Sequence, residues 1–312
     1  MGKFGIISDP GDPHTKAIAA CLTTMGHDSV LVNSAGSGRF SFCDGKWLYK
    51  DADINGINVF YFRNMLSPLP PAYFEGEYKL YQDWYAQYMR AREIFGVQLS
   101  WLYALLAEGK EIVNPPVAAG IGVLKPHQLF VLINARFPFP ATLLTNDPLD
   151  ALAFLEKKGK VIYKPAMGGA FTEVLDEKAR DRLSLIRNQY VIFQEFVEGK
   201  DIRVTATEDE ILSVAELESE AVDFRATPGY MENQTKITET TIPDDIAKLC
   251  LDGIKLLGLR YSGIDLKQTN DGRYLFLEFN VHPAFLWIEE KTKAGIPAGL
   301  VRLLVKLEKD KL

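Results

Sequence analysis

One stretch of this 312-residue chain decides most about its fold, and over residues 263–280 it reads GIDLKQTNDGRYLFLEFN. Asp271-Gly272 separates two runs in which apolar and polar residues alternate, a pattern typical of a β-hairpin with a two-residue turn. With that turn, the opposed pairs are Asp265 with Glu278, Leu266 with Leu277, and Ile264 with Phe279. We therefore predict a hairpin with one apolar face and one face that carries two carboxylates.

The two opposed acids of this hairpin need a positive charge between them. Carboxylates that face each other across a ladder repel, and Mg²⁺ coordinated by hard oxygen ligands, waters and phosphate oxygens would remove that repulsion. Asn280 lies on the same face, two residues or roughly 6.6 Å beyond Glu278. We predict that Asp265, Glu278 and Asn280 bind metal. The alternative is a solvent-exposed hairpin in which Lys267 and Arg273 neutralise the acids. A three-residue loop would place Asp265 on the wrong face.

Further upstream, an apolar strand carries a lysine into a glycine loop. Residues 161–170 read VIYKPAMGGA. Gly168 and Gly169 would let backbone N–H groups approach phosphate oxygens, while the Lys164 ammonium acts as a point charge. Taken alone this motif is not specific, because an ordinary turn has the same composition.

The next strand contains a polar pair inside an apolar run. Residues 191–197 read VIFQEFV, and Gln194 and Glu195 need partners if the strand is buried. An adenine edge and ribose hydroxyls would supply them, and solvent at an edge strand is the alternative. Shortly after, Asp201 and Arg203 share one strand face, where the acid can meet ribose and the guanidinium phosphate. A surface ion pair is the alternative there.

Length and composition set the broad class. A chain of this length with 47% hydrophobic residues buries a large core and subdivides into two or three lobes. The net charge of −6 and the lack of a basic run argue against a nucleic-acid binder. No segment approaches the ~20 apolar residues of a membrane span, and the three scattered cysteines fit a reducing compartment. We expect a cytoplasmic α/β protein that binds neither nucleic acid nor a membrane.

The remaining elements follow from local patterns. The N-terminal part reads strand, helix, strand over 4–7, 15–25 and 29–32, which predicts a βαβ lobe. Its first loop, residues 8–13, lacks the glycine fingerprint of a Rossmann dehydrogenase. A long helix over 77–108 has an aromatic face, interpreted as core or as a subunit interface, so a homodimer is one expected assembly. After a boundary near 114–122, the expected helices are 125–135, 177–187, 243–257 and 296–309, and the expected strands are 141–145, 160–166, 190–197, 201–207 and 211–217.

The ordered set of motifs resembles the ATP-grasp superfamily in its RimK-like branch, from about Val113 to the C-terminus. The motifs are Lys125, Lys164 with its glycine loop, Gln194-Glu195-Phe196-Val197, Asp201-Ile202-Arg203, Asp265, and Glu278-Phe279-Asn280. The resemblance implies an α/β fold in which two α+β lobes (124–200 and 201–312) grip ATP behind a βαβ-type pre-grasp domain (1–123). It further implies that Lys125 and Lys164 hold the phosphates, that adenine lies against Gln194–Val197, and that Asp265, Glu278 and Asn280 hold two Mg²⁺ ions.

Within that branch, three stretches look like the graspetide ligases, the microviridin-type enzymes that cyclise ribosomal peptides. They are Pro140–Pro148, Val222–Arg225 and Leu286–Glu289. The chain departs from these enzymes at Phe224, where they often have tryptophan, and at residues 281–284, which follow the last metal ligand.

This resemblance implies a reaction through an acyl phosphate that ends in a side-chain ester or amide. Catalysis is then expected from Arg203, Arg225 and Asp223, with charge neutralisation as the main effect. The expected partners are ATP and either a precursor peptide or a small carboxylate and amine. One alternative is a RimK-like ligase that adds a free amino acid, and another is a catalytically silent ATP-binding scaffold.

Overall fold

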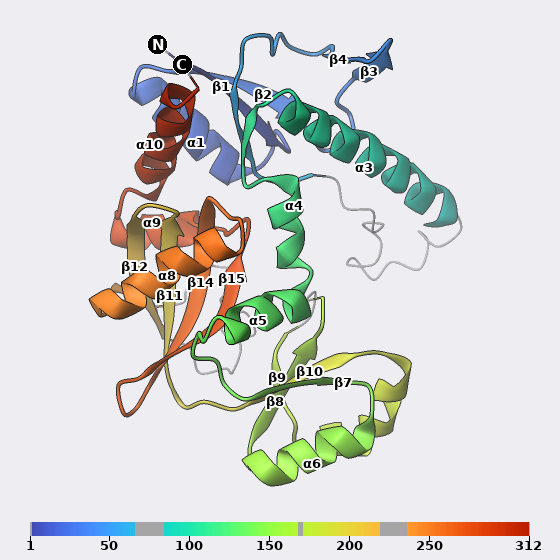
Figure 1. Ribbon diagram of the computed structural model, residues 1–312, viewed down its shortest axis with the longest axis vertical. Helices are drawn as coiled ribbons and strands as arrows, with labels where there is room; N and C mark the ends of the chain where they lie inside the picture. Colours follow the sequence, from blue (N-terminus) through green and yellow to red (C-terminus); the bar gives the residue numbers. More distant parts are fainter. Residues whose placement is uncertain (1, 66–83, 168–170, 219–235, 312) are drawn as a thin grey trace. The chain divides into compact units, whose positions relative to one another are not determined.

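The structure is a computed structural model and describes residues 2–65, 84–167, 171–218 and 236–311 (Figure 1). It divides into two compact units. One comprises Met1–Pro116 together with Pro297–Leu312, and the other comprises Val117–Ile296. Helices and strands mix throughout the described residues, which confirms the predicted α/β class.

The first unit is built on a parallel sheet with the strand order β2-β1-β5-β6. Its strands are β1 (Lys3–Ser8), β2 (Asp28–Asn33), β5 (Val59–Phe62) and β6 (Glu111–Val113). Helix α1 (Pro13–Thr24) connects β1 to β2, as the predicted βαβ lobe requires, and Asp12 caps it by accepting hydrogen bonds from the His14 and Thr15 N–H groups. The unit also contains β3 (Phe40–Cys43), β4 (Lys46–Tyr49), α3 (Trp84–Ala107) and nearly all of α10 (Ile296–Lys309).

The second unit contains two antiparallel sheets. The first has the order β7-β10-β8-β9. Its strands are β7 (Thr142–Thr145), β10 (Val191–Glu195), β8 (Val161–Pro165) and β9 (Glu173–Val174). One face of this sheet buries Val161 and Phe193 against α6 (Pro148–Lys158), α7 (Glu177–Asp181) and the 3-10 helix η3 (Leu183–Asn188). The helix expected over 177–187 is therefore split into α7 and η3 at Arg182.

The second sheet has the order β13-β12-β11-β14-β15. Its strands are β13 (Lys236–Glu239), β12 (Ile211–Glu218), β11 (Gly199–Thr207), β14 (Tyr261–Thr269) and β15 (Tyr274–Asn280). Helix α8 (Asp244–Leu256) covers one face of this sheet (Figure 1). Its residues Cys250 and Ile254 belong to the apolar core on that face, to which α5 (Lys125–Asn134) adds Leu132. Shorter helices are α4 (Pro116–Ala119), the 3-10 helix η2 (Gly120–Gly122) and α9 (Leu286–Thr292).

The β14–β15 hairpin differs from its prediction in two ways. Its loop has three residues, Asn270–Gly272, because the Thr269 N–H donates to the Arg273 carbonyl at 2.8 Å, and Gly272 takes φ +85°. The predicted two-residue turn is therefore wrong. The ladder then shifts by one residue between Asp265 and Leu266, so that Leu277 is an extra residue in β15, a β-bulge.

This bulge restores the alignment that the longer loop would have lost. Asp265 pairs with Glu278 and Ile264 with Phe279, as predicted, whereas Leu266 pairs with Phe276 instead of Leu277. The physical reason lies in the core. The rings of Phe276 and Phe279, three residues apart, are both fully buried and stack at 5.7 Å. Strand residues three apart share a face only if one residue between them is bulged.

Within the described residues, no helix alone is sufficiently long and apolar to cross a membrane. A bent pair of helices, Pro116–Gly122 with Lys125–Asn134, passes the same test of length and composition.

Candidate functional site

The polar face of the second sheet carries three ion pairs among the described residues. Asp201 lies opposite Lys267 and Arg203 opposite Asp265 in the ladder between β11 and β14, and Asp265 lies opposite Glu278 in the ladder between β14 and β15. The ion-pair distances are 2.7 Å from Lys267 Nζ to Asp201 Oδ1, 2.6 Å from Arg203 Nε to Asp265 Oδ1, and 2.8 Å from Lys125 Nζ to Glu278 Oε2. Asp201, Asp265 and Glu278 therefore each have a cation beside them.

The structure brings the predicted metal-binding residues together. Asp265 and Glu278 are partly exposed, at 22% and 23% of their side chains, and the Asn280 amide donates to Asp265 Oδ2 at 2.9 Å. Two carboxylates and an amide oxygen are hard donors of the kind that Mg²⁺ prefers, with waters and phosphate oxygens completing its shell. No group of three or more His, Cys, Asp or Glu side chains in the described part of the chain could hold a metal by itself. The donor set thus fits a metal shared with a nucleotide.

The pKa values of the two opposed carboxyls move in opposite directions. Burial raises the pKa of Asp265, and the nearby charge of Glu278 adds to this effect, while Arg203 opposes it. Burial would also raise the pKa of Glu278, but Lys125, Lys164 and Arg203 outweigh it and hold that pKa below its usual value. Glu278 is therefore the more firmly ionised partner.

Lys125 reaches Glu278 because helix α5 is fixed to the outer edge of β15. The side chain of Gln128, one turn after Lys125, is buried and forms two hydrogen bonds with the Phe279 backbone. It accepts from the N–H at 2.8 Å and donates to the carbonyl at 3.0 Å. An edge strand leaves such groups unpaired, so Gln128 takes the place of a neighbouring strand. The sequence analysis did not predict this role for Gln128. The available clue was its position three residues after Lys125, on the same face of the helix.

The first sheet places Lys164 and Gln194 on the face opposite to its apolar core, whereas Glu195 lies on the same face as Phe193, at the end of β10. Gln194 is 1% exposed and donates to Thr142 Oγ1 at 2.9 Å, and the Lys164 ammonium lies 3.5 Å from Gln194 Oε1. Glu195 pairs with Lys158 at 3.0 Å. The chain itself thus supplies partners for the polar pair that the sequence placed in an apolar strand.

The remaining predicted nucleotide-binding and catalytic residues either follow β10 or lie outside the described ranges. The Phe196 ring lies under the Lys160 ammonium at 3.7 Å, and Val197 follows it outside β10. Gly168, Gly169, Asp223 and Arg225 lie outside the described residues.

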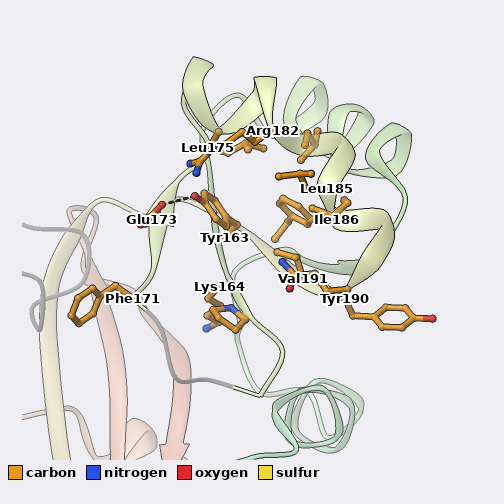
Figure 2. A pocket seen from close by; sticks show the side chains of 15 residues that line it. Tyr163, Lys164, Phe171, Glu173, Leu175, Arg182, Leu185, Ile186, Tyr190 and Val191 are labelled. Carbon is orange, nitrogen blue, oxygen red and sulfur yellow. Dashed lines mark hydrogen bonds between the residues drawn. The ribbon is translucent and has the colours of Figure 1, made fainter. Parts of the chain in front are cut away.

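A cavity of about 370 Å³ is lined mostly by residues of the other face of the first sheet, and Lys164 also lines it. Tyr163 and Phe193 of the sheet line it together with Leu183 and Ile186 of η3. Figure 2 shows the Tyr163 hydroxyl donating to the Glu173 carboxylate at its edge. Burial and this acid raise the pKa of Tyr163 to about 12, so the phenol stays protonated. Because strand residues alternate between faces, Tyr163 and Phe193 point away from the face of Lys164 and Gln194.

The sequence profile of the RimK-like ATP-grasp domain matches residues 124–304. The chain belongs to this family and is an ATP-dependent ligase.

Individual relatives refine the comparison. A tetrahydromethanopterin:alpha-L-glutamate ligase of Methanocaldococcus jannaschii is 25% identical over 64% of this chain and 72% of its own length. The ATP-grasp ligase PsnB, solved with a phosphomimetic variant of its minimal precursor, Mg and ADP, is 27% identical with a TM-score of 0.86, over 97% of this chain and 98% of PsnB. The macrocyclase MdnC of Microcystis aeruginosa, at 18% identity and a TM-score of 0.77 over 98% of this chain and 100% of MdnC, shares the fold.

These comparisons confirm three predictions: the RimK-like ATP-grasp resemblance, the fold class, and the class of enzyme.

Proposed function

We propose that this ligase uses MgATP to activate a side-chain carboxyl group of a ribosomal precursor peptide and joins it to a hydroxyl or amine of the same peptide. The observation that carries the proposal is the polar face of β11, β14 and β15, where Asp265, Glu278 and Asn280 converge next to Arg203 and Lys125. The peptide part is supported by the likeness to PsnB, which was solved with its precursor, Mg and ADP.

In this proposal the nucleotide follows the order of residues along the chain. Adenine lies against Gln194, Glu195, Phe196 and Val197, the ribose hydroxyls donate to Asp201, and the phosphates reach Lys125 and Lys164 at the charged end. Gly168 and Gly169 would contribute backbone N–H groups to the phosphates. The charges of Lys125 and Lys164 both lower the pKa of Glu278, which supports this arrangement.

Asp265, Glu278 and Asn280 would hold Mg²⁺, which neutralises phosphate charge when bound. When Mg²⁺ and the nucleotide bind, Lys125 would release Glu278 and Arg203 would release Asp265. Both cations then become available to phosphate oxygens. A charged partner replaces a charged partner in each case, so neither cation is left buried without an anion.

The proposed chemistry is carboxyl activation. An oxygen of the peptide carboxylate attacks the γ-phosphorus of ATP, and the bond to ADP breaks. The acceptor hydroxyl or amine then attacks the acyl carbon, loses its proton, and phosphate leaves. Arg203 stabilises the charge that moves to the phosphoryl oxygens. Arg225 is proposed to orient the acyl phosphate, and Asp223 to take the acceptor proton.

A second candidate is the addition of a free amino acid to a protein or small acid, which the matched glutamate ligases favour. Product mass separates the two. Cyclisation removes one water for each new bond, whereas ligation adds the mass of the amino acid less one water.

The test incubates the purified chain with MgATP and a panel of precursor peptides that carry acidic and hydroxyl or amine side chains, followed by mass spectrometry and ADP measurement. We expect peptide-dependent ADP release and loss of water. An added residue mass from a free amino acid would favour the second candidate. ATP binding without ADP release for any acceptor would instead indicate a silent scaffold.

A homodimer is also proposed, through the aromatic face of α3. Tyr85 and Tyr103 of that helix are exposed at 62% and 44%, which leaves large rings in solvent. Light scattering of the wild-type chain and of Tyr85→Ser tests this, because a monomeric wild type would contradict it.

A further inference from the structure

Lys267 is a charged residue of the polar face to which the proposed reaction gives no role. It lies on β14 two residues after Asp265 and directly opposite Asp201 of β11. Its ammonium is 2.7 Å from Asp201 Oδ1, and the two side chains are 15% and 21% exposed. On its other side Lys267 pairs with Leu275 of β15. Strands on both sides therefore constrain this lysine.

The ion pair of Lys267 with Asp201 differs from its neighbours. Lys125 and Arg203 pair with carboxylates that are proposed metal ligands, so these cations change partners when the nucleotide binds. Asp201 is proposed to bind ribose hydroxyls, which are neutral donors and cannot replace an ammonium. The ion pair of Lys267 with Asp201 is therefore expected to persist when the nucleotide is present, because neither charge gains a competing partner.

The position of the Lys267–Asp201 ion pair along β11 also fits binding of the ribose. Asp201 precedes Arg203 by two residues, roughly 6.6 Å along β11, on the side of the segment Gln194–Val197. The order of base, sugar and phosphate in a nucleotide matches the order of that segment, Asp201 and Arg203. A fixed carboxylate at this point can accept hydrogen bonds from ribose hydroxyls.

We propose that Lys267 is a positioning residue that fixes the Asp201 carboxylate for the ribose and so sets the preference of the enzyme for ribonucleotides. The inference rests on the proposed function and adds a residue and a selectivity to it. Lys267 acts through Asp201 and does not touch the reacting atoms.

The experiment compares Lys267→Met with wild type in direct binding of MgATP, Mg-2′-deoxy-ATP and Mg-3′-deoxy-ATP by calorimetry, without peptide. Loss of a well-oriented hydrogen bond to a charged acceptor weakens ATP binding about tenfold. The deoxynucleotides already lack one of these bonds, so their binding weakens less and the selectivity for ATP falls several-fold. The turnover rate at saturating ATP stays near wild type.

Lys200→Met is the matched control. Lys200 is on β11 next to Asp201 but on the opposite face, and it also forms a strand-to-strand ion pair, with Glu216 at 2.8 Å. Its loss should leave the preference for ATP over the deoxynucleotides unchanged.

Two further variants keep the proposal testable if Lys267→Met folds poorly. Lys267→Arg keeps the charge and should retain part of the selectivity. Asp201→Asn should lose the selectivity, and adding Lys267→Met to it should cause no further loss, because both changes act on one contact. Equal weakening of all three nucleotides in Lys267→Met, or full selectivity in Asp201→Asn, would overturn the role of Lys267. A wild-type chain that binds no nucleotide would instead sink the proposed function.

Discussion

The two sheets of the second unit bury one face each and use their other faces differently. On the first sheet the polar groups Thr142, Gln194 and Lys164 meet through hydrogen bonds to an amide. On the second sheet, acids and bases meet in ion pairs, as with Arg203 and Asp265. The amide face suits an uncharged, planar group with donors and acceptors, and the ionic face suits phosphate and metal.

The two faces show two ways in which a polar sheet face can be stable before a ligand binds. A buried amide bonded to a hydroxyl has its hydrogen-bonding needs met, and a partly buried acid beside a base avoids an isolated charge. Each face is therefore satisfied within the chain, yet each arrangement can be exchanged for a ligand of the same character.

The largest effect is expected from removing a carboxylate of the ionic face. Glu278→Gln keeps the size of the side chain but removes the negative charge that Mg²⁺ requires. Peptide-dependent ADP release should fall roughly a hundredfold to a thousandfold, by analogy with the loss of one electrostatic catalytic group. Glu216→Gln, an acid of the same sheet on its opposite face, should keep near wild-type activity. Equal losses in the two variants would break the contrast between the faces.

Lys125→Met is expected to have a large effect in the opposite direction: it should strengthen metal binding in the absence of nucleotide. Lys125 lies 2.8 Å from Glu278, so its ammonium competes with a cation for that carboxylate. Without it, Mn²⁺ should bind several-fold more tightly, by about 1 kcal/mol or more for a charge pair of this exposure. Electron paramagnetic resonance of free Mn²⁺ measures this.

The same Lys125→Met variant should bind MgATP more weakly, because a phosphate ligand is lost. Weaker Mn²⁺ binding without nucleotide would show that Lys125 supports the carboxylate instead of competing for it.

A smaller effect is expected on the first sheet. Gln194→Leu removes the amide from a buried position and leaves Thr142 without its donor. Discrimination between ATP and GTP should fall about tenfold, the effect of one or two hydrogen bonds, while Mn²⁺ affinity without nucleotide stays the same. A changed Mn²⁺ affinity would mean that the two faces are not independent.

The smallest effect concerns pH. Metal binding requires ionised carboxyls, so it is lost as pH falls through their pKa values. Burial raises the pKa of Asp265 above its ordinary 3.8, and this residue should therefore take up a proton first on acidification. In Asp265→Asn the remaining loss of Mn²⁺ affinity should move to lower pH, because the pKa of Glu278 lies below its ordinary value. Titration of Mn²⁺ binding at decreasing pH checks the direction, and a move to higher pH would contradict it.

Much of the fold was predictable because it depends on local patterns. The βαβ lobe, most strands of both sheets and the Asp265–Glu278 pair followed from apolar periodicity and turn residues, whereas the short edge strands β9 and β13 were not predicted. The strand β4 had a comparable signal, since Asp44-Gly45 precedes an alternating run, yet it was not predicted. Loop length was misjudged because Asp271-Gly272 fits both a two-residue turn and the end of a longer loop. The spacing of Phe276 and Phe279 was the available clue to the bulge.

The partners of the site residues could not be predicted in the same way. Lys125 and Glu278 are separated by 153 positions in the sequence, and Gln128 depends on how α5 packs against the edge of β15. Such contacts are set by tertiary packing, which no local pattern records. For the same reason the cation paired with Asp201 could not be chosen in advance from the several lysines nearby.

Because of the bulge at Leu277, the hairpin should respond differently to a deletion and to an insertion in β15. If one residue between the loop and Glu278 is deleted, the extra position can be used up, and Asp265 and Glu278 remain opposite each other in an uninterrupted ladder. If one residue is inserted there, no such reserve exists, and Glu278 turns to the core side. Natural and engineered variants of this hairpin should therefore tolerate shortening of β15 better than lengthening.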